Sequence, residues 1–251
     1  MDQTLIRPLK VMSYNVLAER YCQLNRLHHL IDHPEATKIL DWKERLKLII
    51  QRITSYSPDL LCLQEIELST FLVDFMELFP SYDYYSHEIS KQRSNVIGNV
   101  ILWRPEILSC YRKSFSSCAL FTSMTDGSRT FEVCCVHLKA GLRSGVKERV
   151  SQITSCLLRL PKGPALITGD FNDAFEGNAD VQEVLLTRDY IHHHCGITWS
   201  SQDLEGKCFY NAFDHVFSQG ITVEVRVNDC TDIIPNLVHG SDHFPIEFTI
   251  S

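Results

Sequence analysis

The sequence predicts a mixed α/β fold in which β-sheets are covered by helices. Two long segments show helical periodicity, many short apolar runs have the length of strands, and turn residues separate these runs. Many strands with few helices favour sheets covered by helices over one parallel sheet. The chain has 251 residues, enough for one large core, so we expect a single domain over residues 1–251.

The first helix is expected over Asp41–Tyr56. The apolar residues of this segment fall on one helical face: Trp42, Leu46, Ile49, Ile50 and Ile53. Asp41 and Glu44 stand at its start as in a capping box, and Pro58 ends it. The run DLLCLQE that follows is too short for a helix and is expected to be a buried strand. This helix-to-strand unit ends in a carboxylate, Glu65.

A second helix-to-strand unit is expected from Val146. Its apolar face consists of Val146, Val150, Ile153, Leu157 and Leu160. The segment PKGP then breaks the chain, and ALITGD is a strand that ends in Asp170. Further strands are expected at NVIGNVILW, EILSCY, TFEVCCVHL, AFDHVF, ITVEVRV and FPIEFTI, joined by turn-rich segments such as MTDGS.

Composition and charge exclude several classes of protein. The count of 24 Lys and Arg against 31 Asp and Glu gives a net charge of -7, which argues against a protein that holds long polyanions by charge alone. No apolar run approaches the roughly 18 residues of a membrane span, and the opening segment resembles neither a signal peptide nor a presequence. We therefore expect a cytoplasmic protein, with a nuclear location left open.

The 10 cysteines are expected to be buried thiols. Most lie inside apolar runs such as LLCLQ and VCCVHL, and no CxxC motif occurs, so neither a zinc ribbon nor a redox motif is supported. The triplet His192-His193-His194 is expected to lie in a solvated loop, because neighbouring residues of an extended chain point to alternate sides.

Polar residues interrupt or end several of the predicted strands. They are Asn15, Glu65, His137, Asp170, Asn172, Asp214, Asp242 and His243. Taken singly, an Asp or Asn after a strand is more often a turn former or a helix cap. Their recurrence along one chain favours a site built at the rim of a buried sheet.

This set of side chains suits metal-assisted attack of water on a phosphate ester. Glu65, Asp242 and Asn15 offer hard oxygen ligands for Mg²⁺ or Mn²⁺, whereas the sequence shows no paired His/Cys cluster for zinc. The other groups can stabilise charge on a phosphorane and act as a base towards water: His137, Asn172, Asp170 and an Asp214–His243 pair.

The blocks SYNVL, LQE, HLKA, GDFN, FDHVF and SDH, in this order, resemble the signature of the Mg²⁺-dependent endonuclease/exonuclease/phosphatase superfamily. The resemblance runs from about Val11 to Phe248, and GDFN with a terminal SDH is specific in combination. The helix around DWKER and the HLKA block are similar to the branch of deadenylases, nocturnin and the Angel proteins. The resemblance implies an α+β sandwich of four layers, with two face-to-face, mainly antiparallel β-sheets flanked by helices.

The resemblance also implies roles for the polar residues. Glu65 would be the main metal ligand, with Asn15 and Asp242 completing the metal and phosphate environment. His137 and Asn172 would stabilise charge on the phosphate oxygens. Asp170 would orient or deprotonate water, and Asp214 would pair with His243; which of Asp170 and His243 is the base stays open.

Three residues are expected to contact the substrate: Lys139, Asn99 and Arg143. Lys139 matches the HLKA block of the branch, and Asn99 lies in its glycine-containing strand. Where nocturnin-like proteins tend to have an arginine, this chain has Gly141, with Arg143 two positions later. The chain thus departs from the branch at its phosphate-binding arginine.

Several functions are compatible with these observations. The favoured one is hydrolysis of RNA phosphodiester bonds, as a 3'-5' exoribonuclease with a deadenylase-like preference. A nucleotide phosphatase for 2'-phosphates or cyclic phosphates is the alternative, and a DNA-repair nuclease or phosphodiesterase is a lesser one. A non-catalytic binding module would be expected to have lost a core site residue, and none of those named above is replaced.

Overall fold

The structure is a computed structural model that describes residues 7–23, 27–90, 96–141, 145–175 and 180–251. Its helices are α1 (Ala36–Leu40), α2 (Trp42–Tyr56), α3 (Val146–Arg159) and α4 (Asp180–Leu186). Its strands are β1 (Leu9–Asn15), β2 (Leu60–Glu67), β3 (Asp83–Ser90), β4 (Ile97–Trp103), β5 (Ser109–Phe115), β6 (Ala119–Thr125), β7 (Thr130–His137), β8 (Ala165–Asp170), β9 (Ile191–His193), β10 (Trp199–Gln202), β11 (Cys208–Asn211), β12 (Asp214–Gln219), β13 (Val223–Arg226) and β14 (Ile246–Ile250). Among the described helices, none is long and apolar enough to cross a membrane.

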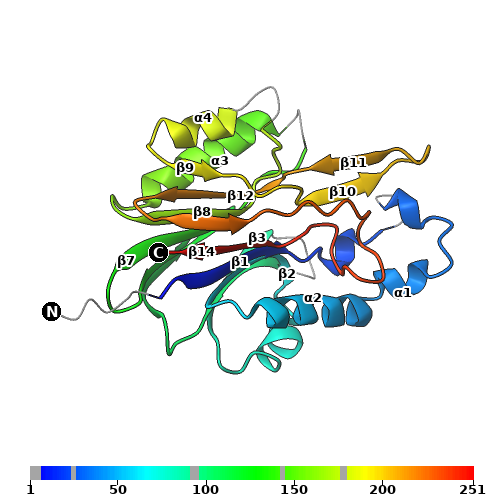
Figure 1. Cartoon of the computed structure of the whole chain (residues 1–251), viewed down its shortest axis with the longest axis horizontal. Coiled ribbons are helices and arrows are strands. Elements are labelled where there is room, and N and C mark those ends of the chain that lie inside the picture. Colours follow the sequence, from blue (N-terminus) through cyan, green and yellow to red (C-terminus); the bar gives the residue numbers. More distant parts are fainter. Residues whose placement is uncertain (1–6, 24–26, 91–95, 142–144, 176–179) are drawn as a thin grey trace.

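Four layers make up the fold, as the resemblance implied (Figure 1). One six-stranded sheet has the order β13-β14-β1-β2-β4-β3, and the other has the order β5-β6-β7-β8-β12-β9. Helix α2 covers the outer face of the first sheet, and α3 and α4 cover that of the second. In each sheet the pairs are antiparallel except one, β1 with β2 and β7 with β8. The predicted fold class is confirmed.

The core is layered in the same way. A central cluster of buried residues from both sheets includes Val11, Leu60, Ile101, Val133 and Val216. Two outer clusters lie under α2 and under α3 with α4. Alternate residues of one strand therefore enter different clusters, because side chains of a strand point to opposite faces and both faces are covered.

The two predicted helix-to-strand units are confirmed. The carboxylate of Asp41 accepts a hydrogen bond from the backbone N–H of Glu44 at 3.1 Å, which caps α2. The Glu44 carboxylate does not close the capping box and pairs instead with Lys47 at 2.6 Å. Ser57 ends the helix in the left-handed conformation, with φ of 55°. Both following strands deliver their acidic residues to the same region of the molecule.

Three details of the strand prediction were wrong. Residues Ala119–Thr125 form β6, which includes the first two residues of MTDGS. The turn therefore begins at Asp126. Strand β5 starts at Ser109, so only the second half of EILSCY belongs to it. The histidine triplet is not a solvated loop, because Ile191–His193 pairs with β12 as an edge strand. For β9 the partner β12 lies farther along the chain, and short-range pattern does not report it, whereas β5 and β6 pair with consecutive strands.

Candidate active site

A cavity of about 680 Å³ opens between the two sheets' ends and the hairpin β10–β11. Polar residues in its lining include Glu65, His137, Lys139, Asp170, Asn172, Asp242 and His243. Aromatic residues in its lining are Tyr21, Trp199 and Phe213. Most of the residues singled out from the sequence thus meet in one cavity, although they span the chain from β2 to the segment before β14.

Asp170 lies at the centre of this arrangement, at the end of β8. Its carboxylate accepts from Asn15 Nδ2 at 3.0 Å and from the backbone N–H of Asn172 at 2.7 Å. His137 Nε2 is 3.6 Å away, because the parallel register of β7 and β8 places His137 opposite Asp170. Gly169 permits this close pairing: it has φ of 139°, and a Cβ there would lie 2.0 Å from the carbonyl oxygen of Val136.

Glu65 is presented by an irregularity in β2. The register with β4 shifts between Leu63 and Ile66, and Glu65 itself has φ of 60°. Its carboxylate accepts from the backbone N–H of Ala18 at 3.0 Å and lies 3.8 Å from His137 Nε2. A non-glycine residue in this conformation is strained, and such strain persists where surrounding contacts hold it. The bulge therefore aims the Glu65 side chain into the cavity.

Asn15 does not offer the oxygen ligand that the sequence predicted. Its Nδ2 donates to the carboxylates of both Asp170 and Glu65, the latter at 3.3 Å, and its Oδ1 accepts from the backbone N–H of Leu17 at 3.0 Å. The side chain is fully buried. In this structure Asn15 orients the two carboxylates rather than facing a metal with its oxygen.

Asp214 and His243 form the expected pair. His243 Nδ1 donates to Asp214 Oδ2 at 2.7 Å, and Nε2 then points to Asp170 Oδ2 at 3.9 Å. The antiparallel register of β12 and β8 places Asp214 opposite Asp170, which explains the cluster. The Thr198 hydroxyl holds the start of β12 by accepting from the backbone N–H of Asp214 at 2.9 Å.

Burial and neighbouring charges oppose each other at Asp170 and at His243, and the pKa of both groups is raised. Burial raises the pKa of Asp170, while the nearby His243 opposes the rise. Burial alone would lower the pKa of His243, but the carboxylates of Asp214 and Asp170 outweigh it and raise that pKa well above its usual value. Because Asp170 and His243 lie close together, a proton gained or lost there belongs to the pair and not to one residue.

Asp242 is the clearest candidate for a metal ligand. It is half-buried, burial raises its pKa, and its buried Oδ1 atom has no hydrogen-bond partner within the part of the chain that the structure describes. A buried carboxylate oxygen without a partner is costly, and a hard cation would satisfy it. The group Asp170, Asp214 and His243 also has its ligand atoms within 4.8 Å of one another. In that group His243 Nδ1 already donates to Asp214 Oδ2 at 2.7 Å, so Glu65 and Asp242 are the better candidates to hold a metal.

Arg45 supports the site, and the sequence analysis missed it. Although it belongs to α2, it is buried, and its guanidinium donates to the carbonyl oxygens of Val16, Leu17 and Gly240 at 2.9–3.2 Å. These contacts tie the end of β1 to the segment that carries Asp242. Arg45 lies four residues before Ile49 and eight before Ile53, on the buried face of α2, and a charged residue at this helical spacing was the signal that could have found it.

The predicted substrate contacts have different outcomes. Lys139 lines the cavity and is exposed. Asn99 is fully buried, does not line the cavity, and donates through Nδ2 to the carbonyl oxygen of Cys135 at 3.1 Å, so the structure does not support a substrate contact there. Arg143 lies outside the described residues. Gly141, where relatives tend to have arginine, has φ of 105°, a conformation that favours glycine.

Comparisons with known proteins agree with this geometry. The model of the endonuclease/exonuclease/phosphatase family matches residues 12–243, which confirms the family resemblance of the sequence blocks. A probable RNA exonuclease of Schizosaccharomyces pombe is 25% identical over 68% of this chain and 38% of its own length. The chain therefore spans well under half of that relative.

Two solved structures show the same fold. The catalytic domain of human Nocturnin with bound sulfate superposes with a TM-score of 0.73 at 20% identity, over 97% of this chain and 93% of that one. ANGEL2, described as a 2',3'-cyclic phosphatase and solved with adenosine-2',3'-vanadate, gives a TM-score of 0.74 at 15% identity, over 97% and 95%.

Proposed function

The chain belongs to the endonuclease/exonuclease/phosphatase family, and from this membership we propose that it hydrolyses phosphodiester bonds of RNA as a Mg²⁺-dependent 3'-5' exoribonuclease that prefers poly(A). The observation that carries the proposal is the convergence of Glu65, His137, Asp170, Asp242 and His243 in one cavity. The RNA exonuclease relative supports RNA as the substrate.

The donor set fits a hard divalent cation. The carboxylates of Glu65 and Asp242 lie in the same cavity, and the burial of Asp242 leaves one oxygen without a partner. A cavity with these carboxylates and Asp170 would repel a phosphate unless a cation neutralised them. When bound, Mg²⁺ would polarise the phosphoryl oxygens and offset the charge that develops on them.

The chain's own residues supply positioning and proton transfer. Asp170 orients or deprotonates the attacking water, because its carboxylate is held by Asn15 and by the backbone N–H of Asn172. His137 donates to a phosphate oxygen from the side of Asp170 and Glu65. The Asp214–His243 pair holds a proton beside Asp170, with Nδ1 fixed by Asp214 and Nε2 free to face the substrate.

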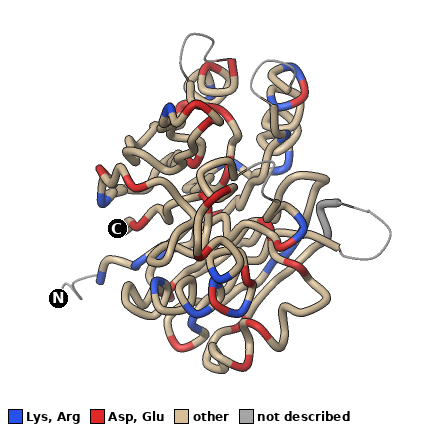
Figure 2. The backbone as a smooth tube through the Cα atoms, turned by 90° about the vertical axis from the view of Figure 1, so that its right-hand side faces the viewer, with Lys and Arg blue, Asp and Glu red and all other residues tan. Residues whose placement is uncertain are grey.

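Local contacts must hold the RNA, since the net charge is -7. Figure 2 shows positions of Lys and Arg interspersed with positions of Asp and Glu along the backbone. Lys139 offers a cation in the lining, and Trp199, Tyr21 and Phe213 offer aromatic surfaces for bases. We expect recognition of a few nucleotides at a chain end, rather than attraction of a long polyanion.

A panel of substrates tests the proposal. The purified protein with Mg²⁺ is incubated with 5'-labelled oligo(A), mixed-sequence RNA, single-stranded DNA, and a dinucleotide carrying a 2'-phosphate. A ladder of shortened products on RNA, strongest on oligo(A), is the expected result. Substitution of Asp170 or Glu65 by Ala should abolish it, and wild-type activity in either variant would overturn the site assignment.

A nucleotide phosphatase for 2'-phosphates or cyclic phosphates is the second candidate. The cavity volume of about 680 Å³ is that of a small-ligand pocket, and one structural neighbour is described as a 2',3'-cyclic phosphatase. An oligonucleotide ending in a 2',3'-cyclic phosphate joins the panel for this reason. Loss of the terminal phosphate with an intact oligonucleotide chain would favour this candidate over the exonuclease.

A further inference from the structure

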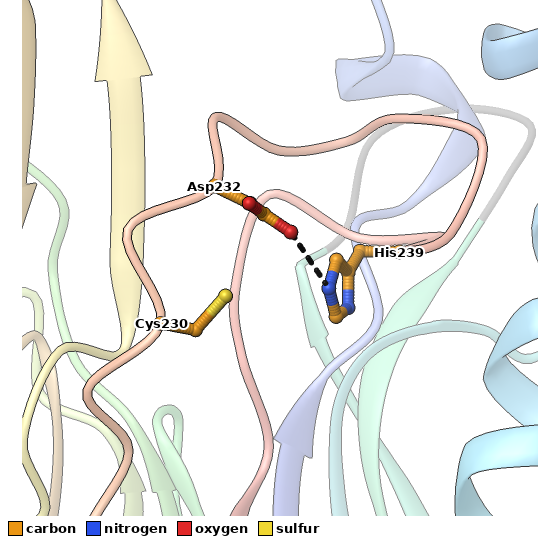
Figure 3. Close-up of side chains that lie close together, drawn as sticks. All are labelled: Cys230, Asp232 and His239. Atoms are coloured by element: carbon orange, nitrogen blue, oxygen red, sulfur yellow. Dashed lines mark ion pairs between the residues drawn. The ribbon is translucent and has the colours of Figure 1, made fainter.

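A second cluster of metal-ligating side chains lies in the segment that leads to the candidate active site. Cys230, Asp232 and His239 each offer one ligand atom, and these atoms all lie within 4.8 Å of one another. Figure 3 shows the three side chains turned toward one another from two stretches of the same loop. Cys230 and His239 line a separate cavity of about 270 Å³, which shares no lining residue with the catalytic one.

The spacing of these atoms suits a tetrahedral ion. His239 Nε2 lies 3.5 Å from Asp232 Oδ2. With zinc–nitrogen and zinc–oxygen bonds of about 2.0–2.1 Å, two ligands of a tetrahedral ion lie about 3.3–3.4 Å apart. The observed distance between His239 and Asp232 is close to this value. With a zinc–sulfur bond of about 2.3 Å, the sulfur would sit about 3.6 Å from either atom. Cys230 Sγ lies within 4.8 Å of both atoms, so a shift of at most about 1.2 Å would bring it to this distance.

Hydrogen bonds hold the backbone of each of the three residues in place. Cys230 N–H donates to Asn228 Oδ1 at 3.3 Å, and the carbonyl oxygen of Asp232 accepts from the Ser200 hydroxyl at 2.7 Å. His239 N–H donates to Asn236 Oδ1 at 2.9 Å. Ligands fixed in this way lose little conformational freedom when an ion binds, which favours affinity.

The charges around His239 allow a neutral imidazole. Its ring packs edge-on against Phe244, with centroids 5.1 Å apart. Burial lowers the pKa of His239, with Arg52 acting in the same direction and Asp232 opposing, so the ring is neutral at pH 7 and can bind a metal. Arg52 is itself paired with Glu247 at 2.8 Å, which limits its repulsion of a cation.

We propose that Cys230, Asp232 and His239 bind one Zn²⁺ ion, with a solvent molecule as the fourth ligand, outside the catalytic cavity. A thiolate and an imidazole select Zn²⁺ over the Mg²⁺ expected at Glu65 and Asp242, because Mg²⁺ prefers oxygen ligands alone. The sequence did not suggest this site: the ligand spacing is C-x-D-x₆-H, and one of the three ligands is a carboxylate.

Bound zinc would close the loop between Cys230 and His239. Gly240, Ser241 and Asp242 follow directly, and the Ser241 hydroxyl donates to the carbonyl oxygen of Asn15 at 2.7 Å. The ion would thus stabilise the segment that delivers Asp242 and His243 to the catalytic cavity. The site requires no phosphoesterase activity, so its test stands apart from that of the proposed function.

Cobalt substitution tests the site by a signal specific to a cysteine ligand. The protein is stripped with a chelator, kept reduced with a phosphine, and titrated with Co²⁺. A thiolate-to-cobalt charge-transfer band in the near ultraviolet should saturate at one equivalent, and Zn²⁺ should abolish it. Cys230→Ser should remove the band, and His239→Asn or Asp232→Asn should weaken Co²⁺ and Zn²⁺ binding by at least about tenfold.

Cys208→Ser is the matched control, because Cys208 is also half-buried but lies in β11, outside the cluster. It should leave the band and the affinity unchanged. The exposed Asp232 gives a variant that cannot disturb the core, and thermal unfolding of the metal-free variants checks that each is folded. Absence of the band in the wild type, or its persistence in Cys230→Ser, overturns the proposal.

Discussion

Acid should destabilise the fold through His215. This residue is buried in a chain of hydrogen bonds in which every group donates in the same direction. His215 Nε2 lies 2.7 Å from the carbonyl oxygen of Asp173, which can only accept, so Nε2 carries the proton. Nδ1 of the neutral ring then accepts from His192 Nε2 at 3.1 Å, and His192 Nδ1 accepts from Gln182 Nε2 at 3.2 Å. Protonation of His215 would place two N–H donors face to face.

The size of the effect follows from the pKa shift. Burial lowers the pKa of His215 from 6.5 to about 3, with the Asp173 carbonyl opposing and His192 adding to the shift. Between these values the unfolded chain binds a proton that the folded chain does not, so stability is lost as the pH falls below 6.5. At pH of about 5, His215 alone lowers the free energy of unfolding by about 2 kcal/mol relative to pH of about 7.5.

Urea unfolding at these two pH values measures the effect. His215→Gln removes the titration while its amide can still donate to the Asp173 carbonyl oxygen. Other groups, such as Asp170 and Asp242, contribute equally to both proteins and cancel in the comparison. The pH-induced loss should be about 2 kcal/mol smaller in the variant; losses that agree within about 0.5 kcal/mol would refute the reasoning.

Three further substitutions test the site. Asp242→Asn removes a charge from a partly buried side chain, so without metal the variant should unfold at a temperature at least as high as the wild type. Addition of Mg²⁺ should raise the unfolding temperature of the wild type but not that of the variant. A rise in the variant equal to that of the wild type would contradict the metal assignment. Asp214→Asn should lower phosphoesterase turnover by a factor of about 10² or more, measured in a rate assay. The rise of its unfolding temperature on Mg²⁺ addition should equal that of the wild type. Arg45→Met leaves buried carbonyl oxygens without a donor and should cost at least about 2 kcal/mol in urea unfolding, whereas the exposed Lys47→Met should change it by less than about 0.5 kcal/mol.

Local periodicity and end signals were sufficient to predict the elements that carry the site. The apolar face of α2 and its Asp41 cap are encoded by neighbours in sequence, and so are the strand that contains Glu65 and the strand that ends at Asp170; β2 continues past Glu65 to Glu67. Edge strand β9 escaped because its partner β12 lies farther along the chain. Strand β6 also escaped, although it pairs with its chain neighbours β5 and β7. The predicted chemistry followed from residue types at strand ends and from the ordered blocks.

The sequence by itself determined which side chains are available for phosphate chemistry, because their types, order and place after apolar runs are local properties. Only the tertiary structure decided how they are used. It turned the Asn15 amide toward two carboxylates, buried Asn99 between the sheets, and used Arg45 on the buried face of α2 to hold Gly240. It also brought Cys230 and His239 together across a loop. Such contacts depend on packing between distant segments, and no spacing along the chain reports that packing.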